Sequence, residues 1–151
     1  MVNKHFRRSL ELDPHNAEVL TDWGYSFFLQ GKLDEAETAL RMALKEAPSD
    51  KRATNNLALT LGHAGKTEES LALFRQVSGE APAWVNLGYV HVSLGEGEKA
   101  AECFAKALSI DDRLVTAANA LVQIAELQQQ AEQRTARKRQ VAAAKSAQAK
   151  S

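Results

Sequence analysis

The residues that could carry chemistry are few and lie far apart in the chain. Histidines occupy positions 5, 15, 63 and 91, and the one cysteine is Cys103. His63 and His91 could approach each other on neighbouring helices. However, two imidazoles without a thiolate or a carboxylate make a poor zinc site, because zinc takes three or four such ligands. We therefore expect no metal and no cofactor.

The sequence also lacks the motifs of common enzymes, which are phosphate-binding glycine loops, H-E-x-x-H and G-x-S-x-G. The Gly-Glu-Gly run at 95–97 precedes an expected helix and follows another, whereas a nucleotide loop follows a strand. Cys103 shares its helical phase with Ala39 and Leu73, which predicts a buried, unreactive thiol. We predict no enzymatic activity and no catalytic residue.

The composition favours helices, since 26 of the 151 residues are alanine and only three are proline. No apolar run reaches the 18–20 or so residues that cross a bilayer, and the first 16 residues lack the apolar core of a signal peptide. Residues 1–127 carry 13 basic and 18 acidic side chains, whereas residues 128–151 carry six and one. The C-terminal segment is therefore a separate basic zone.

A repeated pattern organises most of the chain. Residues 17–50 align without gaps over 51–78 at an offset of 34, and residues 84–112 repeat the series. Small residues recur where two helices would cross, first at Gly24, Ala58 and Gly88 and again twelve residues later. Glycines at 31, 65 and 95 are placed to end the first helix of each pair, because glycine tolerates the left-handed conformation there. Each copy is predicted to form two antiparallel helices.

These residues resemble the tetratricopeptide repeat (TPR) family, whose pattern is W-x₂-L-G-x₂-Y followed by A-x₃-F. Trp84, Leu87, Gly88, Ala100 and Phe104 meet it literally. The resemblance implies an all-α, right-handed solenoid of antiparallel helix pairs with a C-terminal capping helix. The expected segments are the second helix of a truncated repeat at 1–16, repeats at 17–50, 51–80 and 81–112, a capping helix at 113–130, and a basic, flexible tail at 131–151. The chain would then be a truncated or a short gene product.

One joint departs from the period. Gly24 to Ala58 takes 34 residues, but Ala58 to Gly88 takes 30, so about one helical turn is missing. We expect Gly79 to cap a shortened second helix and Pro82 to lie at the start of the next helix, where its missing N–H is tolerated.

The family resemblance also implies a binding site, because the first helices of TPR proteins line a concave groove that binds peptides. We expect a peptide or a helix of a partner protein there. Most groove residues are carried over from the family by their position in the repeat. Asn56 and Asn86 are added because some family members hold a ligand's backbone with an asparagine there. The resulting set is Thr21, Tyr25, Phe28, Arg52, Asn55, Asn56, Leu59, His63, Val85, Asn86, Tyr89 and Val92. The alternative is that the apolar residues of this set only pack against neighbouring helices and bind no ligand. The Lys and Arg residues of the carboxylate-clamp members are absent.

Three functions remain open. The sequence of residues 55–90 is similar to TPR proteins of the tight-adherence (Flp-type) pilus assembly group, which implies an assembly scaffold in the bacterial cytoplasm or periplasm. Alternatively, the basic tail makes the chain a regulatory adaptor that contacts nucleic acid or an anionic surface. We do not expect nucleic acid as the main partner, because the tail has no aromatic residue for base stacking. Lastly, the chain could be the TPR segment of a larger enzyme.

Overall fold

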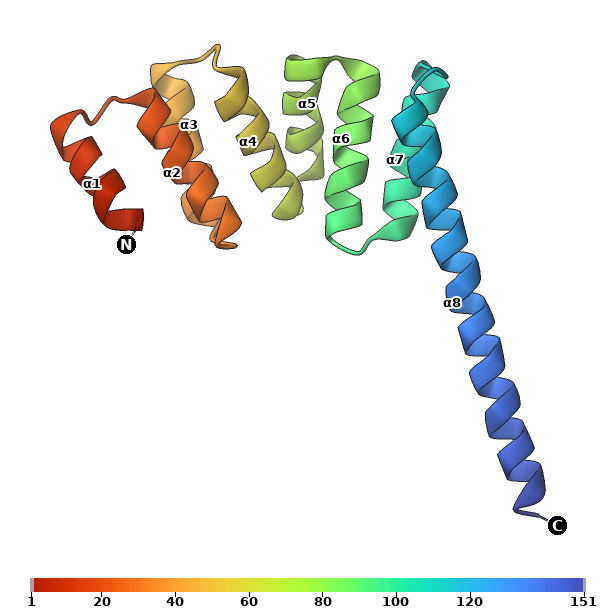
Figure 1. Ribbon diagram of the computed structural model, residues 1–151. Coiled ribbons are helices and arrows are strands. Elements are labelled where there is room, and N and C mark those ends of the chain that lie inside the picture. Colours follow the sequence, from red (N-terminus) through yellow and green to blue (C-terminus); the bar gives the residue numbers. More distant parts are fainter. Residues whose placement is uncertain (1, 151) are drawn as a thin grey trace.

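The computed structural model describes residues 2–150, and every regular element within them is an α-helix. Seven helices form a row, and the eighth runs out of it at the C-terminal end (Figure 1). The helices are α1 (Val2–Leu12), α2 (Ala17–Leu29), α3 (Leu33–Glu46), α4 (Lys51–His63), α5 (Thr67–Ser78), α6 (Glu80–Ser93), α7 (Gly97–Ile110) and α8 (Val115–Gln148).

Local sequence signals set the ends of these helices. The side chain of Asn16 accepts a hydrogen bond from the Val19 N–H (3.0 Å), and Asp50 accepts one from the Arg52 N–H (2.8 Å). Each side chain satisfies an N–H group that lacks a partner in the first turn of its helix. At the other end of α2, Gly31 has φ +73°, the left-handed conformation that terminates the helix.

Helices pack in antiparallel pairs, α2 with α3, α4 with α5 and α6 with α7 (Figure 1). The pairs approach closely at the small residues that the repeat pattern marks. Gly88 of α6 faces Phe104 of α7, and Ala58 of α4 accepts a hydrogen bond at its carbonyl from the buried Ser70 hydroxyl of α5 (2.7 Å). The all-α solenoid of helix pairs predicted from the sequence is therefore confirmed.

Apolar clusters join one pair to the next. Leu40 of α3 packs with Leu57 and Leu61 of α4, and Phe74 of α5 packs with Leu87 of α6. All five side chains are almost completely buried. Because the clusters follow one another along the row, the core is continuous through neighbouring repeats, as in solenoid proteins.

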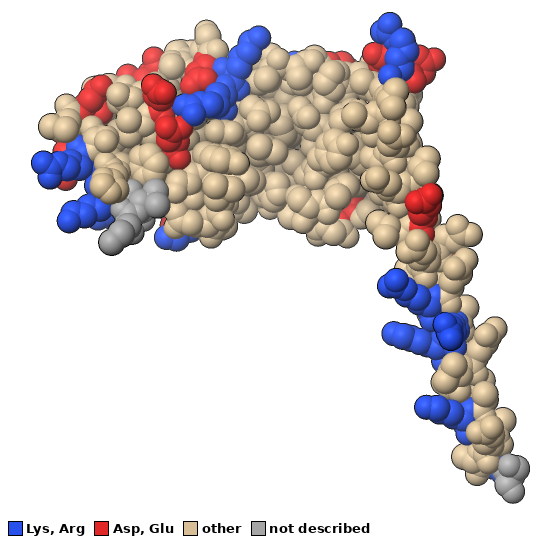
Figure 2. Space-filling model, viewed as in Figure 1, with Lys and Arg blue, Asp and Glu red and all other residues tan. Residues whose placement is uncertain are grey.

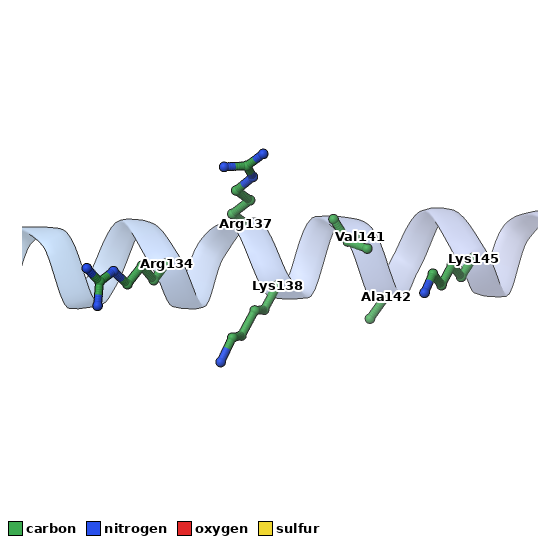
Figure 3. A pocket seen from close by; sticks show the side chains of 6 residues that line it. All are labelled: Arg134, Arg137, Lys138, Val141, Ala142 and Lys145. Carbon is green, nitrogen blue, oxygen red and sulfur yellow. The ribbon is translucent and has the colours of Figure 1, made fainter.

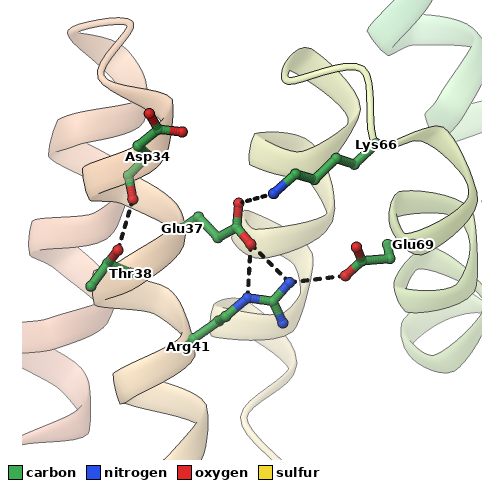
Figure 4. A network of polar contacts seen from close by, with 6 residues as sticks. All are labelled: Asp34, Glu37, Thr38, Arg41, Lys66 and Glu69. Carbon is green, nitrogen blue, oxygen red and sulfur yellow. Dashed lines mark hydrogen bonds and ion pairs between the residues drawn. The ribbon is translucent and has the colours of Figure 1, made fainter.

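A polar network reinforces the junction between α3 and α5 on the second-helix side (Figure 4). The Glu37 carboxylate accepts from Arg41 (2.9 Å) and from Lys66 (2.8 Å), and Arg41 also pairs with Glu69 of α5 (2.9 Å). The hydrogen bond from Lys66, aided by the one from Arg41, holds the pKa of the Glu37 carboxyl below its ordinary value. The network therefore couples two adjacent repeats through ionised groups.

The shortened joint lies at Gly79. Helix α5 ends at Ser78, Gly79 has φ +89°, and α6 begins at Glu80. A single residue thus connects α5 and α6, whereas residues 47–50 connect α3 and α4. Pro82 is the third residue of α6, within the first turn, where N–H groups have no partner inside the helix.

The C-terminal segment differs from the expected boundary at residue 130, because α8 continues without a break to Gln148. Its first part packs against α7 through the buried Ala117 and Ala120 and the half-buried Leu121 and Ile124. The rest has strong intrinsic helix formers, mainly Ala, Gln, Arg and Lys, and no Gly or Pro to stop the helix. The part expected to be a flexible tail is thus the distal half of one long helix.

Candidate peptide-binding face

The predicted groove residues lie on three first helices, α2, α4 and α6, which contact one another in sequence order. We call the surface that they form the first-helix face. Its exposed apolar side chains include Tyr25 (41% exposed) on α2, and Tyr89 (48%) and Val92 (46%) on α6. Half-buried Phe28, Leu59 and His63 lie between them in the chain. Apolar side chains therefore reach the surface on each side of α4.

Ring contacts tie this face together across helices. Tyr25 stacks on Phe28 with 6.1 Å between ring centroids, and the Phe28 ring meets the His63 imidazole edge to face at 5.0 Å. The second imidazole nitrogen of His63, Nε2, lies 2.8 Å from the Ser93 hydroxyl of α6, and Nδ1 lies 2.9 Å from the Leu59 carbonyl. His63 thus contacts α2 and α6 from its place on α4 and fixes the spacing of the three helices.

Two of the predicted groove residues do not reach the surface. Thr21 is completely buried, and its hydroxyl donates to the Ala17 carbonyl of its own helix (2.8 Å). Val85 is 8% exposed and packs in the cluster that contains Phe104 and Ala107. Both side chains are short and β-branched, so they stay close to their helix and are covered by neighbours. They are removed from the candidate site.

The remaining polar positions limit the charge of the face. Asn55, Asn56 and Asn86 are half-buried, and Arg52 is exposed. The Arg52 guanidinium lies 2.7 Å from the Asp22 carboxylate of α2, so the one basic residue among the predicted positions is already paired. A ligand carboxylate would have to share the Arg52 guanidinium with Asp22. The face therefore offers apolar contacts and amide hydrogen bonds rather than a free positive charge.

His91 and Cys103, which the sequence offered as candidates for chemistry, both have a structural place in the fold. His91 is 6% exposed, and its Nδ1 lies 2.6 Å from the Glu96 carboxylate. Cys103 is buried, and burial raises the pKa of its thiol to about 11. Within residues 2–150, no three His, Cys, Asp or Glu side chains are grouped so that they could hold a metal ion. No helix in that range is long and apolar enough to cross a membrane.

The sequence marked the basic C-terminal segment as a possible contact for an anionic surface, but it did not predict that these cations share one helical face on the distal half of α8. Arg134, Arg137, Lys138 and Lys145 share one side of the helix with Val141 and Ala142 (Figure 3). The signal was present in the sequence, because 134, 137, 138, 141, 142 and 145 follow the 3–4 spacing of one helical face. It was missed because the segment was treated as flexible, and residues in a flexible segment share no face.

Comparisons with known proteins agree with the geometry. Family models described as tetratricopeptide repeat match residues 3–51, 21–82 and 81–113. The probable UDP-N-acetylglucosamine–peptide N-acetylglucosaminyltransferase SPINDLY of Hordeum vulgare is 33% identical over an alignment of 113 residues that covers 68% of this chain. The chain spans only 12% of that relative's length.

Solved structures share the fold at low identity. The crystal structure of MamA is 22% identical with a TM-score of 0.57, covering 82% of this chain and 74% of MamA. Pseudomonas aeruginosa pilF is 21% identical with a TM-score of 0.55, covering 83% and 59% of the two chains. The first TPR domain of Spaghetti (RPAP3), bound to an HSP90 peptide, is 22% identical with a TM-score of 0.50, covering 76% and 94%. With its repeated helix pairs and matches from residue 3 to residue 113, the chain belongs to the tetratricopeptide repeat family.

Proposed function

We propose that this TPR array is a non-catalytic scaffold that holds a peptide or a helix of a partner protein on the first-helix face. The observation that carries the proposal is the apolar surface of α2, α4 and α6, where Tyr25, Tyr89 and Val92 are each more than 40% exposed. Tyrosine offers a large contact area at a low entropic cost and is frequent among the residues that dominate binding energy. The fold shared with a TPR domain that was solved with a bound peptide supports the same use.

The face suits an apolar ligand better than an acidic chain terminus. Arg52 is paired with Asp22, and the other predicted polar positions are neutral amides. A half-buried amide such as Asn56 or Asn86 can satisfy a ligand's backbone N–H or C=O, while Tyr25 and Tyr89 cover apolar side chains. The ligand class is therefore an apolar peptide or an amphipathic helix.

A peptide library displayed on phage and selected against the full chain tests the proposal. We expect enrichment of peptides with aromatic or aliphatic residues at regular spacing. The double substitution Tyr25→Ala and Tyr89→Ala should weaken a selected peptide by about tenfold or more, since each hot-spot truncation costs over about 1 kcal/mol. Met42→Ala is the matched control, because Met42 is 49% exposed on α3, outside the face.

A second variant guards against a folding defect, since Tyr89 also packs edge to face on the buried Phe104 at 5.2 Å. Val92→Glu changes an exposed side chain only and should weaken the same peptide. Unchanged affinity in both variants, with native circular dichroism and melting temperature, would place the binding site elsewhere.

We further propose pilus or secretion-system assembly in a bacterium as the setting of this scaffold. The similarity of residues 55–90 to tight-adherence pilus assembly TPR proteins supports it, as does the fold shared with P. aeruginosa pilF. Recovery of a pilus or secretion component by cross-linking to the full chain, lost with the Tyr25 and Tyr89 changes, is the expected result.

The second candidate function is that of a TPR segment within a larger enzyme. The 33% identity to part of SPINDLY, a glycosyltransferase by its name, favours it. In that case the first-helix face would hold a substrate protein rather than an assembly partner. The sequence of the whole gene distinguishes the two, because a transferase domain in the same reading frame supports only the second.

A further inference from the structure

In the described part of the chain, the distal half of α8 (131–148) takes no part in the apolar core, whose last member on this helix is Ile124. Helix α8 has 34 residues, whereas the other helices have 11–14, and it extends well past the rest of the row (Figure 1). Every side chain from residue 125 to residue 150 is exposed, including Leu127 (65%) and Val141 (49%). At 1.5 Å per residue, this part projects about 35 Å.

The stripe that packs at the start of α8 continues into this part. Residues on it recur at alternating intervals of four and three, so they lie along one side of the helix. The stripe consists of Ala120, Ile124, Leu127, Ala131, Arg134, Lys138, Val141, Lys145 and Gln148. Ala120 is buried against α7 and Ile124 is half-buried, whereas the members from Leu127 onward are exposed. Three of these exposed members are cationic, Arg134, Lys138 and Lys145.

A shallow apolar groove connects this stripe to the first-helix face. It is lined by Val92 near the end of α6, by Gly95 of the α6–α7 turn and by Gly97 at the start of α7. On α8 it is lined by Ile124, Leu127, Gln128 and Ala131. Val92 is also one of the exposed apolar residues of the first-helix face. The apolar surface therefore runs from α6 onto α8 and ends where the cations begin.

Beyond this groove, Arg134, Arg137, Lys138 and Lys145 form what we call the basic face, with Val141 and Ala142 among them (Figure 3). Figure 2 shows Lys and Arg side chains of this segment on the side of α8 that faces the space beneath the row of repeats. None of the four forms an ion pair with another side chain in the described part of the chain, and the same holds for exposed cations such as Lys51 and Lys106. What distinguishes the basic face is that its four cations lie close together on one helix. Neighbouring like charges on a helix repel, so an anion bound there would relieve the repulsion.

The charge pattern disfavours pairing between two copies of α8 through the basic face. In a parallel, in-register pair, Arg134, Lys138 and Lys145 would each meet the same cation of the second copy, and an antiparallel pair would bring Arg134 against Lys145. Val141 is the one large apolar residue of the basic face, which is too little for insertion into a lipid surface. A long polyanion such as nucleic acid would also meet the net charge of −5 on residues 1–127. A short acidic segment of a protein meets none of these obstacles.

We propose that the basic face of α8 holds an acidic segment of the partner protein whose apolar segment lies on the first-helix face. This inference rests on the proposed function, because the groove at Val92 and Leu127 joins the two surfaces. Arg134 and Lys145 are eleven residues apart on a helix, which is about 16 Å. An extended segment of about five residues or a helix of three turns would cover the basic face.

A fluorescein-labelled hexaglutamate peptide is the probe for the basic face alone. We expect it to bind the full chain with an affinity that falls as salt is raised, since the sites are exposed. Arg134→Glu should weaken binding by about tenfold, the size of one lost charged contact of about 1.4 kcal/mol. The matched control is Arg139→Glu, the same change in residue and net charge about 140° around the helix from Arg134, and it should change affinity less than twofold.

A selected groove peptide extended by six glutamates tests the link between the two surfaces. It should bind more tightly than either part alone, and Arg134→Glu should remove that gain without affecting the unextended peptide. If the unextended peptide binds but hexaglutamate does not, this inference is wrong and the proposed function stands. If hexaglutamate binds but no groove peptide is selected, the proposed function fails while the acidic specificity of α8 stands.

Two competing ligands are tested in parallel. A 20-nucleotide oligothymidylate or vesicles with anionic phospholipid that bind more tightly than hexaglutamate would overturn the assignment to a protein segment. Equal weakening by Arg134→Glu and Arg139→Glu would also overturn it, because the charge would then act without a defined face. Self-association at rising concentration, abolished by Arg134→Glu, would identify the acidic body of a second copy as the occupant instead.

Discussion

Gly88 of α6 lies directly against the ring of Phe104 in α7. A Cβ atom built at Gly88 would lie 2.7 Å from Cε1 and 2.8 Å from Cζ of that ring, closer than real atoms approach. Phe104 is completely buried and packs in a cluster that reaches α8. The absence of a side chain at Gly88 therefore sets how closely the third pair of helices packs.

We expect Gly88→Ala to destabilise the fold by about 1–3 kcal/mol, the usual cost of overpacking a core. Alanine's higher helix propensity, worth about 1 kcal/mol, offsets only part of this cost. Urea unfolding followed by circular dichroism measures it. Gly97→Ala is the control, because a Cβ at Gly97 would meet nothing within 4 Å, and that variant should be neutral or slightly more stable. Equal stabilities of the two variants would contradict the close packing at Gly88.

Such close approaches were the most predictable part of the fold. Gly24, Ala58 and Gly88 recur in one phase because each lies where two backbones cross, so their spacing alone indicates the helix pairs. The shortened joint at Gly79 was also predictable from the sequence, since the loss of a helical turn shifts the phase of every later small residue. The helix crossings depend on contacts within one repeat, and their pattern occurs three times in the sequence.

The candidate site was less predictable because exposure depends on contacts between repeats. Thr21 and Val85 occupy groove positions by family spacing, yet neighbouring side chains cover them. The bridge from His63 to Phe28 and Ser93 joins three helices and has no signature within one repeat. The extent of α8 depends on alanine-rich helix propensity without tertiary contacts, and the same composition also suits a flexible tail.

Glu37 provides a test by pH. Because Lys66 and Arg41 lower its folded-state pKa, its stabilising effect is complete above the unfolded-state pKa of about 4.3 and is lost as the pH falls through the lower folded value. Glu37→Gln should therefore be less stable than the wild type by about 0.5–1.5 kcal/mol at pH 7. The difference should shrink below about pH 4.

Urea titrations at pH 7 and pH 3 measure that difference. Glu69→Gln is the matched variant in the same network, and it should cost less because the Glu69 side chain is more exposed, 57% against 16% for Glu37. A loss for Glu37→Gln that stays constant with pH would show that the network contributes through packing rather than charge.

Cys103 should be unreactive toward thiol reagents in the folded protein. Its pKa of about 11, raised by burial, leaves only a very small fraction as the reactive thiolate at pH 7.5, and the side chain is 5% exposed. Reaction with an aromatic disulfide reagent should be slow at pH 7.5 and complete within minutes in 6 M guanidinium. Rapid labelling of the native chain at pH 7.5 would contradict the buried position.

Removal of residues 131–151 tests whether the distal half of α8 is independent of the solenoid. These side chains are exposed and make no core contact, so the melting temperature of the shortened chain should stay within about 2 °C of the full chain. The helical signal in circular dichroism should fall by roughly the 18 residues from 131 to 148 that belong to α8. A short helix without tertiary packing is marginal in water, so this segment should also be the first to melt when the full chain is heated.

Deletion from residue 121 is the control and should destabilise the solenoid, because it also removes Leu121 and Ile124 from the cluster with Phe104. A large drop in melting temperature on removing only 131–151 would mean that the basic face contacts the solenoid, and it would also remove the basis for an external acidic partner.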